Sequence, residues 1–239
     1  NVAHSVSGSG FVIFGDRALR GGTCQSASYL TAYKNTWDGV IAVSKFDVME
    51  FSYITVVDNH HGITMMEAQG GPGAEATTYL KNSVMVGDSP VPDSTCIDKY
   101  GLYLTSNPTN GKPYLPGKSS LPWYKLKGEP SHHATFDATG NTFMNFEAQE
   151  VTKGSCTNTM SAIKNHDFAA DYGPIYDFSN TIFDNVHHDA VAKLDELSEG
   201  SIDISNCGDF KCTFPENVYL YFRGTTFNNI PETDTLTTD

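Results

Sequence analysis

The sequence predicts an all-β fold, a right-handed parallel β-helix (solenoid) interrupted by one Pro-rich irregular excursion. Short runs rich in Val, Ile, Phe, Tyr and Thr are separated by Asn, Asp and Gly, which is the pattern of strands joined by turns. Several of these runs resemble one another at recurring spacings. Seven of the eleven prolines fall within residues 88–131, which marks the excursion.

Four of the runs share an apolar residue two positions before an asparagine. They are Val57-Asp58-Asn59, Phe143-Met144-Asn145, Phe183-Asp184-Asn185 and Phe227-Asn228-Asn229. The asparagines are separated by 86, 40 and 44 residues, each close to a multiple of about 20–22, a period typical of solenoids. An asparagine tolerates the left-handed conformation at a corner, and its amide can bond to the equivalent residue one turn away. We therefore expect these four asparagines to stack at one corner.

An antiparallel sandwich with Asn-rich hairpin turns is the alternative fold. It is disfavoured because Asn-Gly occurs once, at Asn110-Gly111, and because the repeats point the same way along the chain. The predicted organisation is an N-terminal segment or first turns at 1–39, the β-helix at 40–230 with the excursion at 88–131, and a polar tail at 231–239. Proline cannot donate to a sheet ladder, so the excursion leaves the β-helix. The clearest helical candidate is residues 189–198.

The chain is acidic, with a net charge of −13 from 28 acidic and 15 basic residues. A protein that grips phosphates needs clustered Lys and Arg, so nucleic acid and anionic membranes are poor partners. No stretch has the apolar length of a transmembrane helix, which argues against direct membrane insertion.

Five cysteines predict disulfides and an oxidising compartment. Cys207 and Cys212 bound a loop short enough for a disulfide. Cys96 with Cys156 is the second predicted pair, which would tie the excursion to the body, and the partner of Cys24 stays open. No Cys and His grouping has the spacing of a structural zinc site, so no metal and no cofactor is predicted.

Three kinds of residue could carry chemistry. Three His-His pairs could converge on a metal if their turns stacked: His60-His61, His132-His133 and His187-His188. The alternative is that these histidines lie at solvent-exposed corners and bind nothing. Acid pairs such as Asp184 with Asp189 could serve a glycosidase or a lyase; the others are Asp167 with Asp171 and Asp203 with Asp209. Tyr114, Trp123 and Tyr124 lie among lysines of the excursion and could stack on sugar rings, or could fold the excursion onto the β-helix.

Two segments carry a resemblance to a known family. They are residues 121–128 (LPWYKLKG) followed by 141–146 (NTFMNF), and residues 206–218 (NCGDFKCTFPENV). These strings resemble the pectin-lyase-like, fibrocystin-like region of large ciliate cell-surface proteins, and the resemblance covers about residues 40–230 in order. It implies a parallel β-helix within a longer secreted or surface-anchored protist chain. It offers no catalytic residues to carry over.

These observations predict a non-catalytic extracellular or cell-surface module of a cell coat, matrix or surface filament, with glycan binding by the excursion. The expected partners are neighbouring copies or further domains of the same protein, together with polysaccharide. The end strands of a solenoid leave backbone N–H and C=O groups without hydrogen-bond partners. Neither terminal sequence has the pattern of a segment that would cover them. The alternative is a carbohydrate-active enzyme, a polysaccharide lyase or glycoside hydrolase, on the same scaffold.

Overall fold

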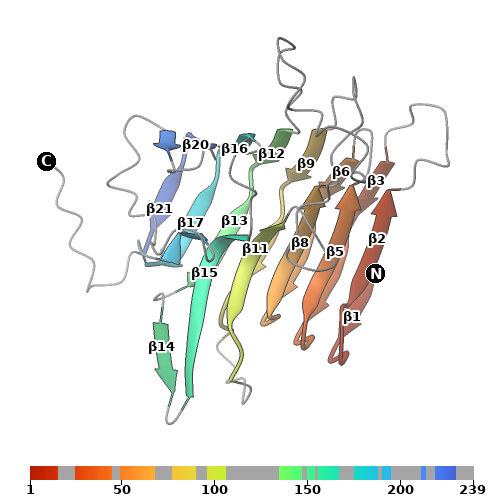
Figure 1. Cartoon of the computed structure of the whole chain (residues 1–239), viewed down its shortest axis with the longest axis vertical. Helices are drawn as coiled ribbons and strands as arrows, with labels where there is room; N and C mark the ends of the chain where they lie inside the picture. The colour runs from red at the N-terminus through yellow and green to blue at the C-terminus, as the bar shows by residue number, and fades with distance from the viewer. Residues whose placement is uncertain are drawn as a thin grey trace, which may run out of the picture.

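The protein is built from parallel β-sheets (Figure 1). The structure, a computed structural model, describes residues 1–15, 25–44, 49–67, 77–89, 96–105, 135–146, 150–153, 156–166, 175–187, 190–194, 211–213 and 219–229. The elements found in these residues are all β-strands, so the predicted all-β class is confirmed. The strands form three sheets, here called A, B and C.

Each sheet collects strands from the whole length of the chain. Sheet A runs β1 (Val2–His4), β4 (Thr31–Tyr33), β7 (Thr55–Val57), β10 (Val84–Val86), β13 (Thr142–Phe146), β17 (Ile182–Val186), β21 (Thr226–Asn228). Sheet B runs β2 (Phe11–Gly15), β5 (Asp38–Ser44), β8 (His61–Glu67), β11 (Lys99–Thr105), β15 (Cys156–His166), and both β14 (Glu150–Lys153) and β18 (Ala192–Leu194) pair with β15. Sheet C runs β3 (Gln25–Ser28), β6 (Met49–Ser52), β9 (Thr77–Lys81), β12 (Thr135–Thr139), β16 (Ile175–Ser179), β20 (Tyr219–Arg223), β19 (Lys211–Thr213).

The chain visits the sheets in the fixed order A, B, C, and we call one such passage a circuit. Neighbouring strands within a sheet come from successive circuits and are parallel. The exceptions are β14 and β19, which pair antiparallel with β15 and β20. In Figure 1 the circuits progress across the molecule from the red N-terminal strands to the blue C-terminal strands.

The connection from sheet C to sheet A is the most regular part of each circuit. It has two residues every time, and the first takes a left-handed conformation, with φ from +49° to +67°. The second residue points inward and is polar in the later circuits. There Asn141 accepts a hydrogen bond from the Ser83 backbone amide (3.0 Å) and donates one to the Leu80 carbonyl (2.9 Å), which joins two circuits inside the protein.

The predicted asparagine corner is confirmed for three of the four repeats. Asn145, Asn185 and Asn229 have φ values of 57°, 54° and 48°, and the Asn185 side-chain amide donates to the Asn145 side-chain oxygen (3.1 Å). Asn145 and Asn185 are the last but one residues of β13 and β17, and Asn229 directly follows β21, so the left-handed residue turns the chain out of sheet A toward sheet B.

The prediction is wrong for Asn59. The strand register aligns Val57 with Met144, through Val86, so Asp58 is the equivalent of Asn145 and takes the left-handed conformation (φ 52°). Asn59 instead is buried and accepts hydrogen bonds from the backbone and side-chain amides of Asn35, both 3.0 Å. Hydrophobic pattern sets the register, and a shift by one residue reverses the faces of a strand.

The predicted period of about 20–22 residues is also wrong. Successive circuits along sheet A advance by 29, 24, 29, 58, 40 and 44 residues, so the gaps of 40 and 44 are single circuits. The extra residues lie in the connections between sheets. Such connections tolerate insertions at small free-energy cost, whereas the strands between them must keep their register.

Two further sequence predictions fail locally. Residues 99–105 form β11, which pairs with β8 and β15, so the segment 88–131 is not one continuous excursion. Residues 192–194 form β18 rather than a helix. The strands within residues 1–39 join the same three sheets as the later ones. Residues 90–95, 106–134 and 231–239 lie outside the described part of the chain.

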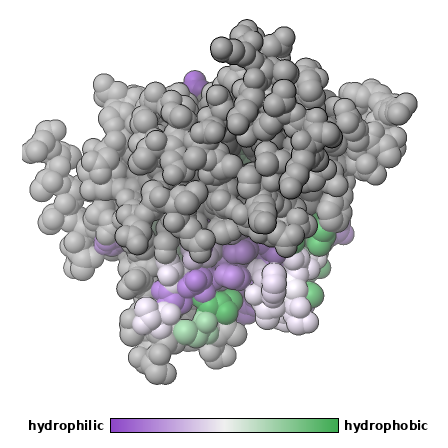
Figure 2. All heavy atoms as spheres, in the orientation of Figure 1, coloured by the Kyte–Doolittle hydropathy of each residue, from purple (hydrophilic) through white to green (hydrophobic). Residues whose placement is uncertain are grey.

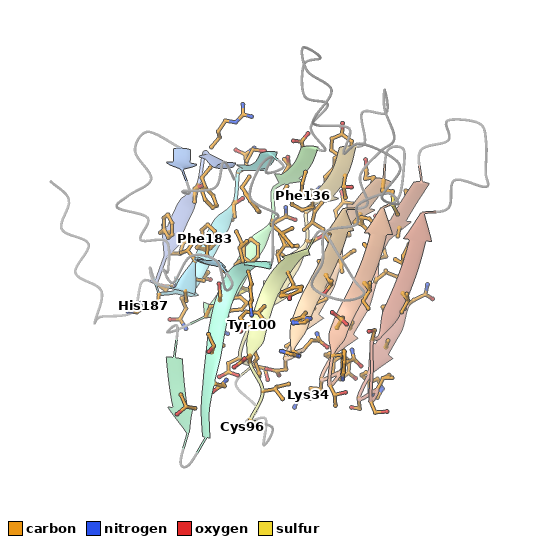
Figure 3. All side chains as sticks on the ribbon, in the orientation of Figure 1. Lys34, Cys96, Tyr100, Phe136, Phe183 and His187 are labelled. Atoms are coloured by element: carbon orange, nitrogen blue, oxygen red, sulfur yellow. The ribbon has the colours of Figure 1, made fainter. Side chains whose placement is uncertain are left out.

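The interior is filled by columns of stacked side chains. Along sheet A the column widens from Ala32 and Val56 through Met85 to Phe143 and Phe183, all at most 1% exposed. The Phe143 and Phe183 rings stack with centroids 5.3 Å apart. Figure 3 shows Phe183 and Phe136 among the strands of the later circuits. Burying each such ring contributes roughly 1.5–3 kcal/mol.

Candidate functional site

The outer face of sheet B is shaped by a ladder of glycines. Gly39, Gly62 and Gly101 follow the first residue of β5, the first of β8 and the second of β11, and the strand pairing skips each of them. A Cβ on Gly39 would lie 2.6 Å from the Gly62 carbonyl oxygen and 2.8 Å from Val56. Only glycine therefore fits this close approach, which interrupts the alternation of the strand in the manner of a β-bulge.

The interruption places side chains three residues apart on the same face. Strict alternation would put residues 61 and 64 on opposite sides of the sheet. Instead His61 and Thr64 both contact the Asp38 carboxylate, from the neighbouring strand. Tyr100 and Tyr103 of β11 share this face in the same way, because Lys164 lies over both of their rings.

A buried carboxylate orients His61. The Asp38 Oδ1 atom is 2.9 Å from His61 Nδ1 and also accepts from the Thr64 hydroxyl, while Oδ2 accepts from Ser9 (2.9 Å). Burial raises the pKa of Asp38, but the hydrogen bonds from His61 and Thr64 outweigh it and hold the pKa below its usual value. The Asp38 carboxylate is therefore charged at neutral pH. It fixes the tautomer that carries the proton on Nδ1, which leaves Nε2 as an acceptor.

Four rings pack side by side over strands β8 and β11, and we call them the ring cluster: His60, His61, Tyr100 and Tyr103. His61 stacks on His60 and on Tyr103, with centroids 4.1 Å apart in both pairs, and its ring lies 5.8 Å from that of Tyr100. The Lys164 ammonium lies 4.2 Å from the Tyr100 ring centroid and 5.7 Å from that of Tyr103.

Figure 3 places Tyr100 among the strands of sheet B, which face the viewer in Figure 1. On that side, Figure 2 shows hydrophilic residues beside weakly polar and hydrophobic ones, below the grey part of the surface. Tyr100 itself is buried, at 3% exposed, whereas the other three rings of the cluster and Lys164 are partly exposed. The exposed part of the cluster therefore combines apolar ring faces with a cation.

The segment before β11 holds Tyr100 in place. Asp98 accepts hydrogen bonds from the Thr159 backbone amide (2.7 Å) and from the Tyr100 hydroxyl (3.3 Å). Asn158 donates to the Ile97 carbonyl (3.2 Å). Cys96 is disulfide-bonded, and its sulfur lies 4.0 Å from the Thr157 carbonyl oxygen. The β15 strand and the segment at 96–98 therefore form one support beneath the cluster.

The environment of His60 predicts a pH-dependent stability. Burial and the neighbouring His61 lower the pKa of His60 to about 4. Between pH 6.5 and 4 the unfolded chain binds a proton that the folded protein does not, so stability falls as the pH is lowered through this window. The expected loss is about 2 kcal/mol, because each pKa unit is worth about 1.4 kcal/mol and solvent screens a half-buried ring.

Urea unfolding at pH 7 and pH 4.5 measures this loss for the protein and for His60→Gln. The variant should lose less stability than the parent, by about 2 kcal/mol. His4→Gln, at an exposed histidine, is the control and should keep the parental difference. An unchanged pH dependence in His60→Gln contradicts the prediction.

Most residues singled out by sequence lie outside this site. Tyr114, Trp123 and Tyr124 are outside the described residues, so the structure leaves the glycan-binding prediction for them untested. The same holds for Cys24 and Cys207, for His132 and His133, and for the acid pairs other than Asp184. Cys212 is in β19 and Cys156 opens β15. Asp184 accepts a hydrogen bond from Asn229 (2.6 Å), and His187 lies apart from Tyr100 (Figure 3).

Within the described ranges, no group of three or more His, Cys, Asp and Glu side chains is arranged to hold a metal ion. In the same residues, no helix is long and apolar enough to cross a membrane. Comparison with protein-family models, with curated proteins and with solved structures finds no match for this chain.

Sequence reasoning noticed His60-His61 but missed the residues that complete the site. Tyr100 and Tyr103 were assigned to the excursion, and Asp38 and Lys164 were not singled out. A repeated pattern carries the missing signal: a polar or aromatic residue, a glycine and an aliphatic residue. It occurs as Asp38-Gly39-Val40, His61-Gly62-Ile63 and Tyr100-Gly101-Leu102. Aligning these three triplets would have brought the first residue of each together.

Proposed function

We propose that this chain is a right-handed parallel β-helix that acts as a non-catalytic extracellular or cell-surface module, and that its outer sheet B binds a polysaccharide. The observation that carries the proposal is the ring cluster, which spans neighbouring strands beside a lysine. The module would belong to a cell coat, matrix or surface filament.

The β-helix is supported by the cyclic order of the strands. Each strand of a sheet is joined to its parallel neighbour by a path through the two other sheets. Connections between parallel strands of one sheet are right-handed in nearly all known cases, which supports a right-handed coil. The two-residue corners and the inward columns repeat once per circuit, as stacked turns of a solenoid require.

Sugar binding is supported by the chemistry of the cluster. Pyranose rings present apolar C–H faces that stack on aromatic rings, and polar neighbours bond their hydroxyls. Parallel strands are about 4.8 Å apart, so a polymer laid across them meets a new side chain at each strand. Here such a polymer would meet the partly exposed side chains of His61, then Tyr103, then Lys164.

The extracellular setting is supported by the disulfide at Cys96. We propose Cys156 as its partner, because the neighbouring Thr157 carbonyl lies beside the Cys96 sulfur. Neighbouring copies or further domains are proposed to cover the edges of β1, β2 and β3, since each ends its sheet in the described part of the chain. At the opposite end of sheet C, the antiparallel β19 covers β20.

One observation favours a second candidate, a carbohydrate-active enzyme. His61 has its Nδ1 proton held by Asp38, so Nε2 could accept a proton from a bound sugar as a general base does. The carboxylates near His61 already accept hydrogen bonds from the protein, which leaves them poorly placed to act on a sugar. Asp38 accepts three hydrogen bonds, and Asp98 accepts one from the Thr159 backbone amide and one from the Tyr100 hydroxyl. Binding without cleavage is therefore the first proposal.

The test compares two tyrosines on different sheets. Tyr103→Ala removes a ring from the cluster and should weaken retention on immobilised polysaccharide about tenfold, the equivalent of 1.4 kcal/mol. Tyr79→Ala is the matched control, since Tyr79 also lies partly exposed beneath a lysine, but on sheet C. It should leave retention unchanged.

Failure of the parent protein to bind any polysaccharide in a broad panel would end the proposal. An equal loss in Tyr79→Ala would remove sheet B as the binding face. Release of short oligosaccharides by the parent, abolished in His61→Gln, would replace the binding module by the enzyme.

A further inference from the structure

A lysine and two carboxylates meet inside the protein, at the corner between sheets A and B. The Lys99 ammonium lies 2.9 Å from Asp58 Oδ1 and 2.7 Å from Asp88 Oδ1. The side chains of Lys99 and Asp58 are 2% and 1% exposed, and that of Asp88 is 19% exposed. Burial lowers the pKa of Lys99, but the hydrogen bonds to Asp88 and Asp58 outweigh it and raise the pKa above its usual value. The three groups are therefore charged, at a depth where charges have lost most of their hydration.

The neighbouring circuits hold both carboxylates in place. Asp58 is a left-handed corner residue (φ 52°), and its backbone amide donates to the Val86 carbonyl (3.2 Å). The Asp88 backbone amide donates to the Asn145 carbonyl (3.1 Å), and the Asp88 carbonyl accepts from the Asn145 side chain (2.9 Å). Folding thus brings an amine and two carboxyl groups together in one fixed arrangement. Such placement raises the effective concentration of intramolecular reactants to about 10⁵–10⁸ M.

The two oxygens of the Asp58 carboxylate have different surroundings. Oδ1 accepts hydrogen bonds from the Ser89 backbone amide and from the Lys99 ammonium, both 2.9 Å. Oδ2 is buried and, among the residues that the structure describes, has no hydrogen-bond partner. A backbone N–H held against a carbonyl oxygen stabilises the negative charge that develops there when a nucleophile attacks the carbon. Oδ1 is therefore placed to remain as a carbonyl oxygen, and Oδ2 is placed to leave.

Apolar side chains close the site beside Asp88. Phe146 and Met160 are 0% and 1% exposed. An atom of each lies 2.8 Å from the position that a Cβ on Gly87 would take, directly before Asp88 in the chain. Water excluded from such a site cannot hydrolyse a product formed there.

We propose that Lys99 and Asp58 condense in the folded protein to an isopeptide bond, with Asp88 as the proton carrier. The Lys99 ammonium passes one proton to Asp88, and the resulting amine attacks the Asp58 Cγ atom. The bond from Cγ to Oδ2 then breaks, as Oδ2 takes the proton from Asp88 and a second proton from the nitrogen and departs as water. Ammonium and carboxylate thus become amide and water, without an oxidant or an outside reactant. The ion pairs in the structure are those of the protein before condensation.

The new bond would join residues 41 positions apart and fasten one circuit of the fold to the next. A covalent link of this kind restricts the unfolded chain as a disulfide does, and reducing agents do not open it. It removes two charges from the interior, where charges are costly to keep. The bond would form whether or not sheet B binds a polysaccharide.

Mass spectrometry of the full chain, reduced and denatured, measures the condensation. The parent should be lighter than its sequence by the mass of one water. A tryptic digest should contain a branched peptide that joins Lys99 to Asp58, because trypsin does not cut after an acylated lysine. Fragmentation of this peptide distinguishes the isopeptide bond from a cyclic imide at an aspartate, such as Asp38 before Gly39, which also loses one water.

Lys99→Met and Asp58→Ala each remove a reacting group and should have the full mass of their sequences. Asp88→Asn keeps the shape of the side chain but cannot carry the proton, so its condensation should be about 100-fold slower. Lys81→Gln is the matched control, because Lys81 lies 2.7 Å from the Glu50 carboxylate in an exposed ion pair. It should lose one water as the parent does.

The parent decides the proposal directly, whether or not every variant folds. A parent of full sequence mass, or one that has lost water without yielding the Lys99–Asp58 peptide, overturns the isopeptide bond. Asp88→Asn protein that condenses as fast as the parent overturns Asp88 as the proton carrier. A second branched peptide joining Lys81 to Glu50 would overturn the buried geometry as the cause, since proximity alone would then suffice.

Discussion

Replacing Lys99 with methionine is expected to destabilise the protein by about 3–5 kcal/mol. The Lys99 ammonium lies 2.9 Å from an Asp58 oxygen and 2.7 Å from an Asp88 oxygen. The side chains of Lys99 and Asp58 are 2% and 1% exposed. Methionine fills nearly the same space, so the cost comes from leaving two carboxylates without their cation rather than from a cavity. Within the described residues, the Asp58 Oδ2 atom already has no hydrogen-bond partner.

A lysine on the surface provides the control for this change. Lys81 forms an ion pair with Glu50 of the same length, 2.7 Å, but the two side chains are 37% and 39% exposed. Lys81→Met should therefore cost less than about 1 kcal/mol. Urea unfolding at pH 7 measures both variants. If both variants lose the same free energy of unfolding, burial is not the reason why the Lys99 ion pairs stabilise the protein. Adding Asp58→Asn to Lys99→Met should recover part of the stability, because it removes one buried charge.

The sequence predicts those parts of the fold that depend on the conformational preference of a single residue. Asparagine takes the left-handed conformation more readily than other non-glycine residues, so Asn145, Asn185 and Asn229 mark their corners. The same conformation at Tyr29 and Tyr53 has no such local signal. Their rings stack with centroids 5.0 Å apart, and hydrogen bonds to the next circuit hold their backbone amides. Tertiary pairing there overrides local preference.

The period was mispredicted for a related reason. Spacing between similar runs counts the inserted connections as well as the strands, and the connections differ in length from circuit to circuit. The site was missed because face alternation, the usual guide to which side chains meet, fails at the glycine ladder. Lys164 was the hardest to foresee, since its strand has Ala162 where the preceding ones have glycine.

Gly62→Ala tests whether the ladder shapes the candidate site. A Cβ on Gly62 would collide with the Gly101 carbonyl of the neighbouring strand and lie 2.8 Å from a Val56 methyl group. The carbonyl belongs to the backbone of β11 and cannot rotate away, so β8 and β11 must separate. We expect a loss of about 3 kcal/mol, at the upper end of what overpacking costs, measured by urea unfolding.

The same movement should reach the ring cluster, because His61 precedes Gly62 and Tyr100 precedes Gly101. The separation of β8 from β11 would pull the His61 ring from that of Tyr103, now 4.1 Å away, and weaken polysaccharide retention together with stability. Gly8→Ala is the control, since a Cβ there meets nothing within 4 Å, and it should change neither property. A Gly62→Ala protein of parental stability would show that the strands absorb the methyl group. The glycines would then not be what brings residues three positions apart onto one face.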